Sequence, residues 1–159
     1  MAIEQTMCTS FKAEVLLGVH DFRAATGDTF KIALYTSSAS IGPSTTAYSS
    51  TNEVTGTGYS AGGVTLTKLG VDDSSFESGA SLGVGYTSFA DVVITNTNVV
   101  AAGALIYNTT PSANGIAGTP LTNPAVCVLD FGGDKTANGG TLTITFPVNA
   151  GDTAIIRIA

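Results

Sequence analysis

The sequence predicts an all-β fold: a β-sandwich of the jelly-roll or immunoglobulin-like kind with one short N-terminal α-helix. Charged residues make up only 11% of the chain and hydrophobic residues 43%, a composition suited to packed strands. Apolar and polar residues alternate with a period of two in several short runs, and turn-forming residues separate these runs. At 159 residues, the chain is expected to form a single domain over residues 1–159. The helix comes first, and strands are expected from about residue 29 onward.

The first element is a helix expected over about residues 10–22. Thr9 or Ser10 can cap its start by accepting a hydrogen bond from the first free backbone N–H groups. Apolar residues recur on one stripe of this helix, as they do when one helix face packs against a core. The stripe contains Phe11, Val15, Val19 and Phe22. Glu14 lies off the stripe, and His20 is expected to be a boundary residue favoured by the negative end of the helix.

The strand signal is clearest near the C-terminus, where Leu142, Ile144 and Phe146 alternate with three threonines. We expect the apolar side chains to pack inward and the β-branched threonines to face water. The runs 90–94 and 126–129 are apolar at almost every position, which favours central strands that are buried on both faces. Further strands are expected at Phe30–Tyr35, Gly63–Lys68, Thr87–Thr95, Ala102–Asn108, Ala125–Phe131 and Thr153–Ile158.

Turn signals separate these strands, among them Gly132-Gly133-Asp134 and Asn138-Gly139-Gly140. Two longer polar stretches, Thr36–Gly63 and Asn108–Asn123, are expected to be loops. Loops of this length in a small domain are usually functional, and in a structural protein they commonly reach a neighbouring molecule. The loop residues that we expect to contact a partner are Tyr48, Asn52, Thr57, Tyr59, Pro111 and Asn114.

The charge pattern argues against binding to nucleic acid or to a membrane. Six basic and twelve acidic residues give a net charge of −6, and the basic residues are scattered, whereas a phosphate-binding surface requires a cluster. The longest apolar stretch, Val99–Tyr107, is far shorter than the ~20 residues of a membrane helix. The N-terminus lacks the basic start and apolar run of a secretory signal, so synthesis in the cytoplasm is expected. Cys8 and Cys127 are expected to be free, buried thiols.

Reactive side chains are scarce, so no enzyme activity, catalytic residue or cofactor is expected. Residues 58–62 match the G-x-S-x-G pattern of hydrolases, but a strand follows them, and the single histidine, His20, lies upstream. The pattern therefore indicates a turn. Pairs such as Asp72 with Asp73, or Asp130 with Asp134, could give oxygen ligands to calcium, but a good calcium site needs several ligands at set spacing. We predict no metal site, and calcium stays open as an alternative.

Several segments, spread over nearly the whole chain, carry a family resemblance. They are Ser10–Glu14, Gly18–Phe22, Asp28–Thr36, Thr51–Val54, Gly56–Gly63, Gly103–Asn108 and Val128–Lys135. In order and spacing they resemble a family of tailed-bacteriophage virion structural proteins. The resemblance implies a capsid decoration or cement protein on the capsid surface of the virion, which binds the major capsid protein and other virion subunits and stabilises the head shell. It supplies no catalytic residues.

Assembly and two alternative functions follow from this resemblance. A homo-oligomer, with a trimer as one form, is expected because copies of such proteins usually assemble with closed symmetry. A tail, adaptor or fibre-base component is the first alternative, and it should co-purify with tails. A surface carbohydrate-binding module is the second, and it would present exposed aromatic rings on a rim. Its candidate rings are Tyr48, Tyr59 and Tyr86.

Overall fold

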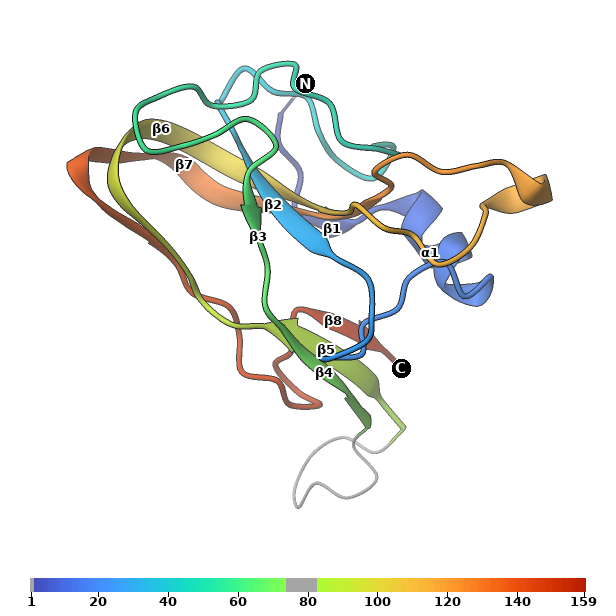
Figure 1. The fold of residues 1–159 in the computed structure, drawn as a ribbon. Coiled ribbons are helices and arrows are strands. Elements are labelled where there is room, and N and C mark those ends of the chain that lie inside the picture. Colours follow the sequence, from blue (N-terminus) through green and yellow to red (C-terminus); the bar gives the residue numbers. More distant parts are fainter. Residues whose placement is uncertain (1, 74–82) are drawn as a thin grey trace.

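The computed structural model describes residues 2–73 and 83–159, which form two antiparallel sheets and one short α-helix (Figure 1). The larger sheet has the order β1-β7-β6-β2-β3 and contains β1 (Thr6–Met7), β2 (Phe30–Tyr35), β3 (Val64–Thr65), β6 (Val92–Asn108) and β7 (Ala125–Ile144). The smaller sheet has the order β4-β5-β8 and contains β4 (Lys68–Asp73), β5 (Gly85–Phe89) and β8 (Ile156–Ile158). The predicted β-rich fold with one short helix is confirmed, and a two-sheet sandwich describes it coarsely.

β6 and β7, of 17 and 20 residues, form the spine of the molecule. They pair antiparallel along most of their length, with several register shifts. The prediction of turns at residues 132–134 and 138–140 is wrong, because both segments lie inside β7. Gly132 and Gly139 have φ values of 69° and 68° there. These glycines therefore form irregularities that bend the strand without ending it, and β6 and β7 run from the larger sheet towards the smaller one (Figure 1).

The period-two prediction near the C-terminus is confirmed, because Ile144 and Phe146 are buried and the intervening threonines are exposed. Of the predicted run 126–129, residues 126–128 are buried, as expected for the centre of a sheet, whereas Leu129 is half-buried. The same expectation for residues 90–94 is wrong, because Val93 is 57% exposed. In this part β6 alternates between a buried and an exposed face, so only one of its faces belongs to the core.

An aromatic cluster joins the two sheets. Phe30 of β2 and Phe89 of β5 have ring centroids 5.9 Å apart, and Phe22 stacks on Phe30 at 4.3 Å. Phe146 also packs against Phe89, at 5.7 Å. Aromatic pairs in these arrangements stabilise a core beyond the effect of their buried area. The core therefore lies between the sheets, and these rings come from distant parts of the chain.

The helix α1 (Thr9–Leu16) is shorter than predicted. Cys8 takes the N-cap position and no side chain caps the helix, so neither predicted cap acts. Gly18 follows the helix with a φ of 68°, a left-handed conformation that commonly ends helices because residues with a Cβ rarely adopt it. Val19 and Phe22 are buried as predicted, but in non-helical chain beyond α1. Three of the four residues of the apolar stripe are thus buried and Val15 is half-buried, while the predicted helix end at residue 22 is wrong.

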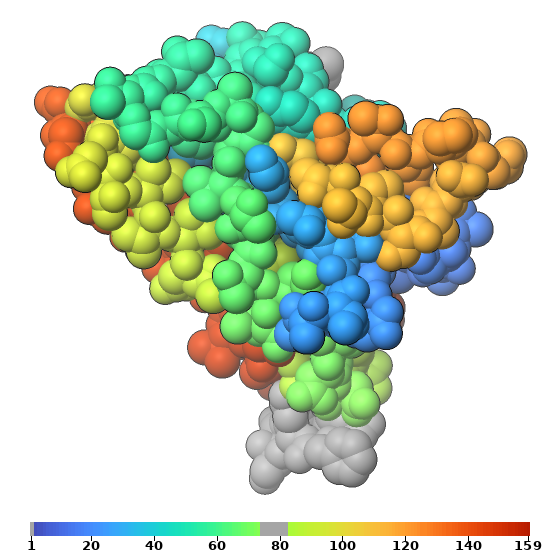
Figure 2. Space-filling view, viewed as in Figure 1, coloured from blue at the N-terminus to red at the C-terminus, as the bar shows by residue number. Residues whose placement is uncertain are grey.

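The two polar stretches are loops, as predicted, with isolated bridges and one short 3-10 turn (Ile116–Gly118). They adjoin each other, since the Tyr48 N–H donates to the Asn123 carbonyl at 2.9 Å. Figure 2 shows residues 36–63 in cyan to green and residues 108–123 in orange over the upper part of the molecule. Cys8 and Cys127 are buried and unbridged, as expected. Within residues 2–73 and 83–159, no helix is long and apolar enough to cross a membrane.

Candidate functional site

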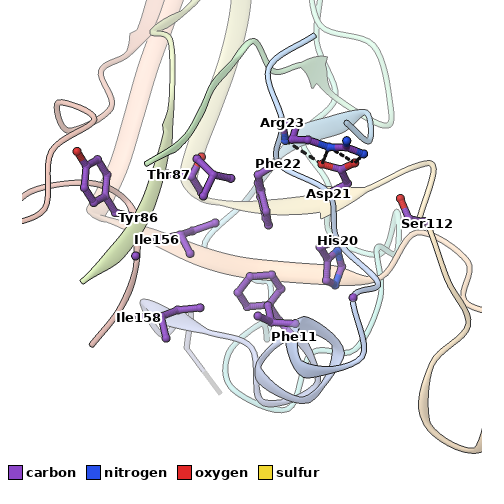
Figure 3. A pocket seen from close by; sticks show the side chains of 14 residues that line it. Phe11, His20, Asp21, Phe22, Arg23, Tyr86, Thr87, Ser112, Ile156 and Ile158 are labelled. Carbon is purple, nitrogen blue, oxygen red and sulfur yellow. Dashed lines mark hydrogen bonds and ion pairs between the residues drawn. The ribbon is translucent and has the colours of Figure 1, made fainter. Parts of the chain in front are cut away.

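A cavity of about 580 Å³ opens between α1, the segment that follows it and the smaller sheet (Figure 3). Its lining is largely apolar, because Phe11 of α1, Phe22 and Ile156 of β8 lie around it. A second cavity, of about 300 Å³, adjoins the first, since Phe11, Val15 and Ile158 line both. We call the two cavities together the apolar groove.

The apolar groove has exposed apolar side chains along its lining. Leu16 is 88% exposed, Val71 60% and Ile158 54%, and each lines at least one of the two cavities. Burial of apolar surface is worth about 25 cal/mol per Å², and contiguous exposed apolar surface commonly marks a place where another molecule docks. The groove is therefore the strongest candidate on this chain for contact with a partner.

An ion pair lies at one side of the groove (Figure 3). The Arg23 guanidinium donates from Nε to both carboxylate oxygens of Asp21, at 3.0 and 2.9 Å, and from Nη2 to Oδ2 at 2.5 Å. The hydrogen bonds from Arg23 lower the pKa of the Asp21 carboxyl to about 2. Because the Arg23 side chain is 72% exposed, water screens the pair and its contribution to stability is small. The pair leaves this side of the groove without net charge, which suits an apolar contact.

A chain of side-chain hydrogen bonds, most of them half-buried, is centred on His20 and lies beside the groove. His20 Nε2 bonds to Glu14 Oε2 at 2.8 Å, and Asn108 Nδ2 donates to His20 Nδ1 at 3.1 Å. Asn108 Nδ2 also donates to Asp28 Oδ2 at 2.8 Å, and the Ser112 hydroxyl donates to Asp28 Oδ1 at 2.6 Å. We call these five residues the polar network. It connects α1, the segment between α1 and β2, the end of β6 and the loop that follows β6.

The hydrogen-bond partners of His20 determine which ring nitrogen carries the proton. An amide nitrogen can only donate, so Nδ1 accepts from Asn108, and Nε2 carries the hydrogen that it donates to Glu14. Burial disfavours the charged ring and lowers the pKa of His20 from its usual 6.5, although the hydrogen bond to Glu14 and the nearby carboxylates oppose this shift. Protonation would also turn a second N–H towards the Asn108 amide donor. The geometry therefore favours the neutral ring, as the lowered pKa does.

Stability should depend on pH through His20. A histidine with a lowered pKa in the folded state binds protons more readily when unfolded, so its contribution is complete above pH 6.5 and is lost as the pH falls towards the lowered pKa. We expect the free energy of unfolding, measured by urea denaturation, to decrease as the pH falls below 6.5. A His20→Gln variant cannot titrate and should show a shallower decrease. Equal pH dependence in the two proteins would contradict this assignment.

Two sequence predictions fail at the polar network. His20 does not cap the helix, because α1 ends at Leu16 and the His20 ring bonds to the Glu14 and Asn108 side chains instead. Glu14, off the predicted apolar stripe, is nevertheless buried. One signal was present in the sequence, since a carboxylate and the single histidine lie six residues apart in a chain with few charges. Buried carboxylates almost always have such a partner.

Tyr48 and Tyr59, two of the predicted contact residues, share a buried carboxylate. The Tyr48 hydroxyl donates to Glu53 Oε2 at 2.6 Å, and the Tyr59 hydroxyl donates to Glu53 Oε1 at 2.7 Å. The Gly62 N–H donates to the same Oε1 at 2.8 Å, and the Leu34 N–H of β2 donates to the Tyr59 oxygen at 2.8 Å. Burial raises the pKa of both tyrosines above the usual range, and the bonds to Glu53 add to this shift. Both half-buried rings therefore fix the loop of residues 36–63 against β2.

The other predicted contact residues lie apart from this carboxylate. Asn52 and Thr57 are exposed in the same loop, and the Thr57 carbonyl accepts the Asn98 N–H of β6 at 3.0 Å. Asn114 is exposed and Pro111 is half-buried in the second loop. Pro111 precedes Ser112, which lines the apolar groove. The structure thus brings Tyr48 and Tyr59 together and leaves the second loop beside the groove, which the sequence did not indicate.

Tyr86, the third candidate for a carbohydrate-binding rim, is buried within β5 and is not in a loop. It packs in a small cluster with Val84 and Ala154. The three candidate rings therefore lie half-buried or buried, and none is fully presented to solvent.

The G-x-S-x-G match forms a turn, as expected, with φ values of 77° at Gly58 and 87° at Gly62. Within the described residues, no group of three or more His, Cys, Asp or Glu side chains is placed to hold a metal ion. Comparison of the chain with models of protein families, with curated proteins and with solved structures finds no match.

Proposed function

We propose that this chain is a bacteriophage virion structural protein that decorates the head shell and stabilises it by binding the major capsid protein. The apolar groove is the observation that carries the proposal, because it offers exposed apolar surface for a protein partner. The resemblance of the segments described above supplies the class of partner. The proposed location is the capsid surface of the virion, after synthesis in the host cytoplasm.

The proposed mechanism is the bridging of neighbouring capsid subunits. The apolar groove receives apolar side chains of one subunit, and the exposed Asn52, Thr57 and Asn114, with Pro111, add contacts to adjacent virion subunits. Each single contact can be modest in affinity, because several contacts on one copy raise the effective concentration of the others. A homo-oligomer multiplies this effect. The finer topology, jelly-roll or immunoglobulin-like, also stays a proposal, supported by the two antiparallel sheets.

Binding to heads should depend on the groove. We expect the purified protein to bind emptied heads and to raise their melting temperature, as measured by co-sedimentation and calorimetry. Leu16→Lys places a charge in the groove and should weaken binding by about tenfold or more, a change of about 1.4 kcal/mol. This substitution is compatible with folding, because Leu16 is exposed and a cation suits the end of a helix.

Val148→Lys is the matched control, because Val148 is 73% exposed and lines neither cavity of the groove. It should bind heads like the unmodified protein. Heads with an unchanged melting temperature, or equal losses in the two variants, would count against the proposal. Recovery of the protein with tails would support the tail alternative instead, and binding on a glycan array would support the carbohydrate alternative.

A further inference from the structure

Part of β7 presents an open edge. β1 pairs with β7 only at Val128 and Cys127, and the remainder of β7 pairs with β6 along its other side. Among the residues that the structure describes, no backbone hydrogen bond joins residues 141–144 of β7, or Thr145 directly after it, to any strand except β6. An open edge of this kind leaves backbone N–H and C=O groups that can pair with another strand.

This edge lacks the features that usually prevent pairing between sheets. Residues 141–145 read Thr-Leu-Thr-Ile-Thr, without a charge or a proline, in a chain whose net charge is −6. Natural edge strands are commonly protected by charged side chains, prolines or very short length. The three threonines are exposed and β-branched, which suits them to a further sheet contact.

A separate apolar cavity, of about 500 Å³ and outside the apolar groove, lies beside the open edge. It is lined by residues 142–145 of the edge and by Leu129, Phe131, Phe146 and Ile155, among others. An open strand edge next to such a cavity provides the two components of strand addition. The backbone hydrogen bonds of the edge supply affinity, and the cavity receives side chains from the added strand.

We propose that a second copy of this chain pairs with the first through the same edge. Residues 141–145 of the two copies pair antiparallel about a two-fold axis at Thr143. The sequence of the edge is self-complementary in this register. Leu142 stands opposite Ile144 of the second copy, and the threonines stand opposite threonines. Residues directly opposite each other in an antiparallel pair share one face of the sheet, so apolar pairs meet on one face and threonine pairs on the other. No charge meets a like charge.

The contact uses the same patch on both copies, as two-fold interfaces do. It joins the two larger sheets into one continuous sheet and covers the cavity beside each edge. The basic unit is therefore a dimer. This inference goes beyond the proposed head-shell role, and it holds or fails independently of whether the chain binds heads.

The experiment measures the oligomeric state by sedimentation equilibrium. The unmodified protein should form dimers. Thr143→Lys places two like charges opposite each other at the two-fold axis and should raise the dissociation constant of the dimer by about tenfold or more. Thr65→Lys is the matched control, because Thr65 is exposed on β3 at the opposite edge of the same sheet. It adds the same charge and should leave the dimer intact.

A charge-pairing experiment tests whether repulsion between the two lysines, and not some other effect of Thr143→Lys, dissociates the dimer. Thr143→Glu should weaken the dimer to a similar extent, and an equimolar mixture of Thr143→Lys and Thr143→Glu should restore the dimer. Circular dichroism checks that each variant keeps its strand content. A monomeric or trimeric unmodified protein, equal dissociation in Thr65→Lys, or a mixture that stays monomeric would overturn the proposal.

Discussion

Replacing Asp28 with alanine should lower the free energy of unfolding by about 3–5 kcal/mol, the sum of several lost hydrogen bonds to a charged group. Asp28 is buried and accepts three of them. The donors are the Asp21 N–H at 2.9 Å, Asn108 Nδ2 at 2.8 Å and the Ser112 hydroxyl at 2.6 Å. Alanine leaves these donors without their acceptor, and the Asn108 amide then no longer holds the His20 ring as firmly.

Urea denaturation followed by circular dichroism measures this loss. Asp134→Ala is the control, because it removes the same charge from an exposed residue of β7 and should change stability by no more than about 0.5 kcal/mol. Similar values for the two variants would mean that the change in net charge, and not the polar network, sets the stability.

Gly63→Ala should destabilise the fold by about 3 kcal/mol or more, because it combines overpacking with backbone strain. Gly63 has a φ of 73°, and a Cβ there would lie 1.9 Å from the Ile32 carbonyl oxygen and 2.8 Å from the Ala33 Cα. Both atoms belong to the backbone of β2, which β6 holds in register on its other side. The clash therefore cannot be relieved by a side-chain rotation.

Gly118→Ala separates the two causes. Gly118 has a φ of 75°, but a Cβ there would meet nothing within 4 Å, so only the left-handed backbone is penalised, by about 1–2 kcal/mol. The midpoint of urea unfolding should shift much further for Gly63→Ala than for Gly118→Ala. Equal shifts would show that β2 yields to the added atom.

Local patterns predicted the parts of the fold that depend on neighbouring residues. The alternation of Leu142, Ile144 and Phe146 with threonines sets which side chains are buried, because side chains on a strand point to opposite faces in turn. The glycines of β7 were misinterpreted as turns, because the same residue types form turns and bulges. Only the pairing of β7 with β6, which joins distant residues, distinguishes the two.

The candidate site was less predictable for the same reason. The apolar groove combines α1 and β8, which come from opposite ends of the chain, with β4 and β5 from its middle. The polar network likewise joins His20 and Asp28 to Asn108, some 80 residues further along. Sequence separation of this size leaves no periodic pattern. Composition did give one useful hint, since each charged residue in a chain with so few is more informative than usual.

The pairing of β1 with Val128 and Cys127 has a consequence for biosynthesis. A ribosome produces Thr6 and Met7 long before their strand partners, Val128 and Cys127, are translated. Long-range pairings of this kind also slow folding, because the intervening chain must close a large loop before the contact forms. Folding of the larger sheet is therefore completed only after residues 127 and 128 have been translated, and a chain stalled before residue 127 leaves the apolar surface of β2 and β6 open to chaperones.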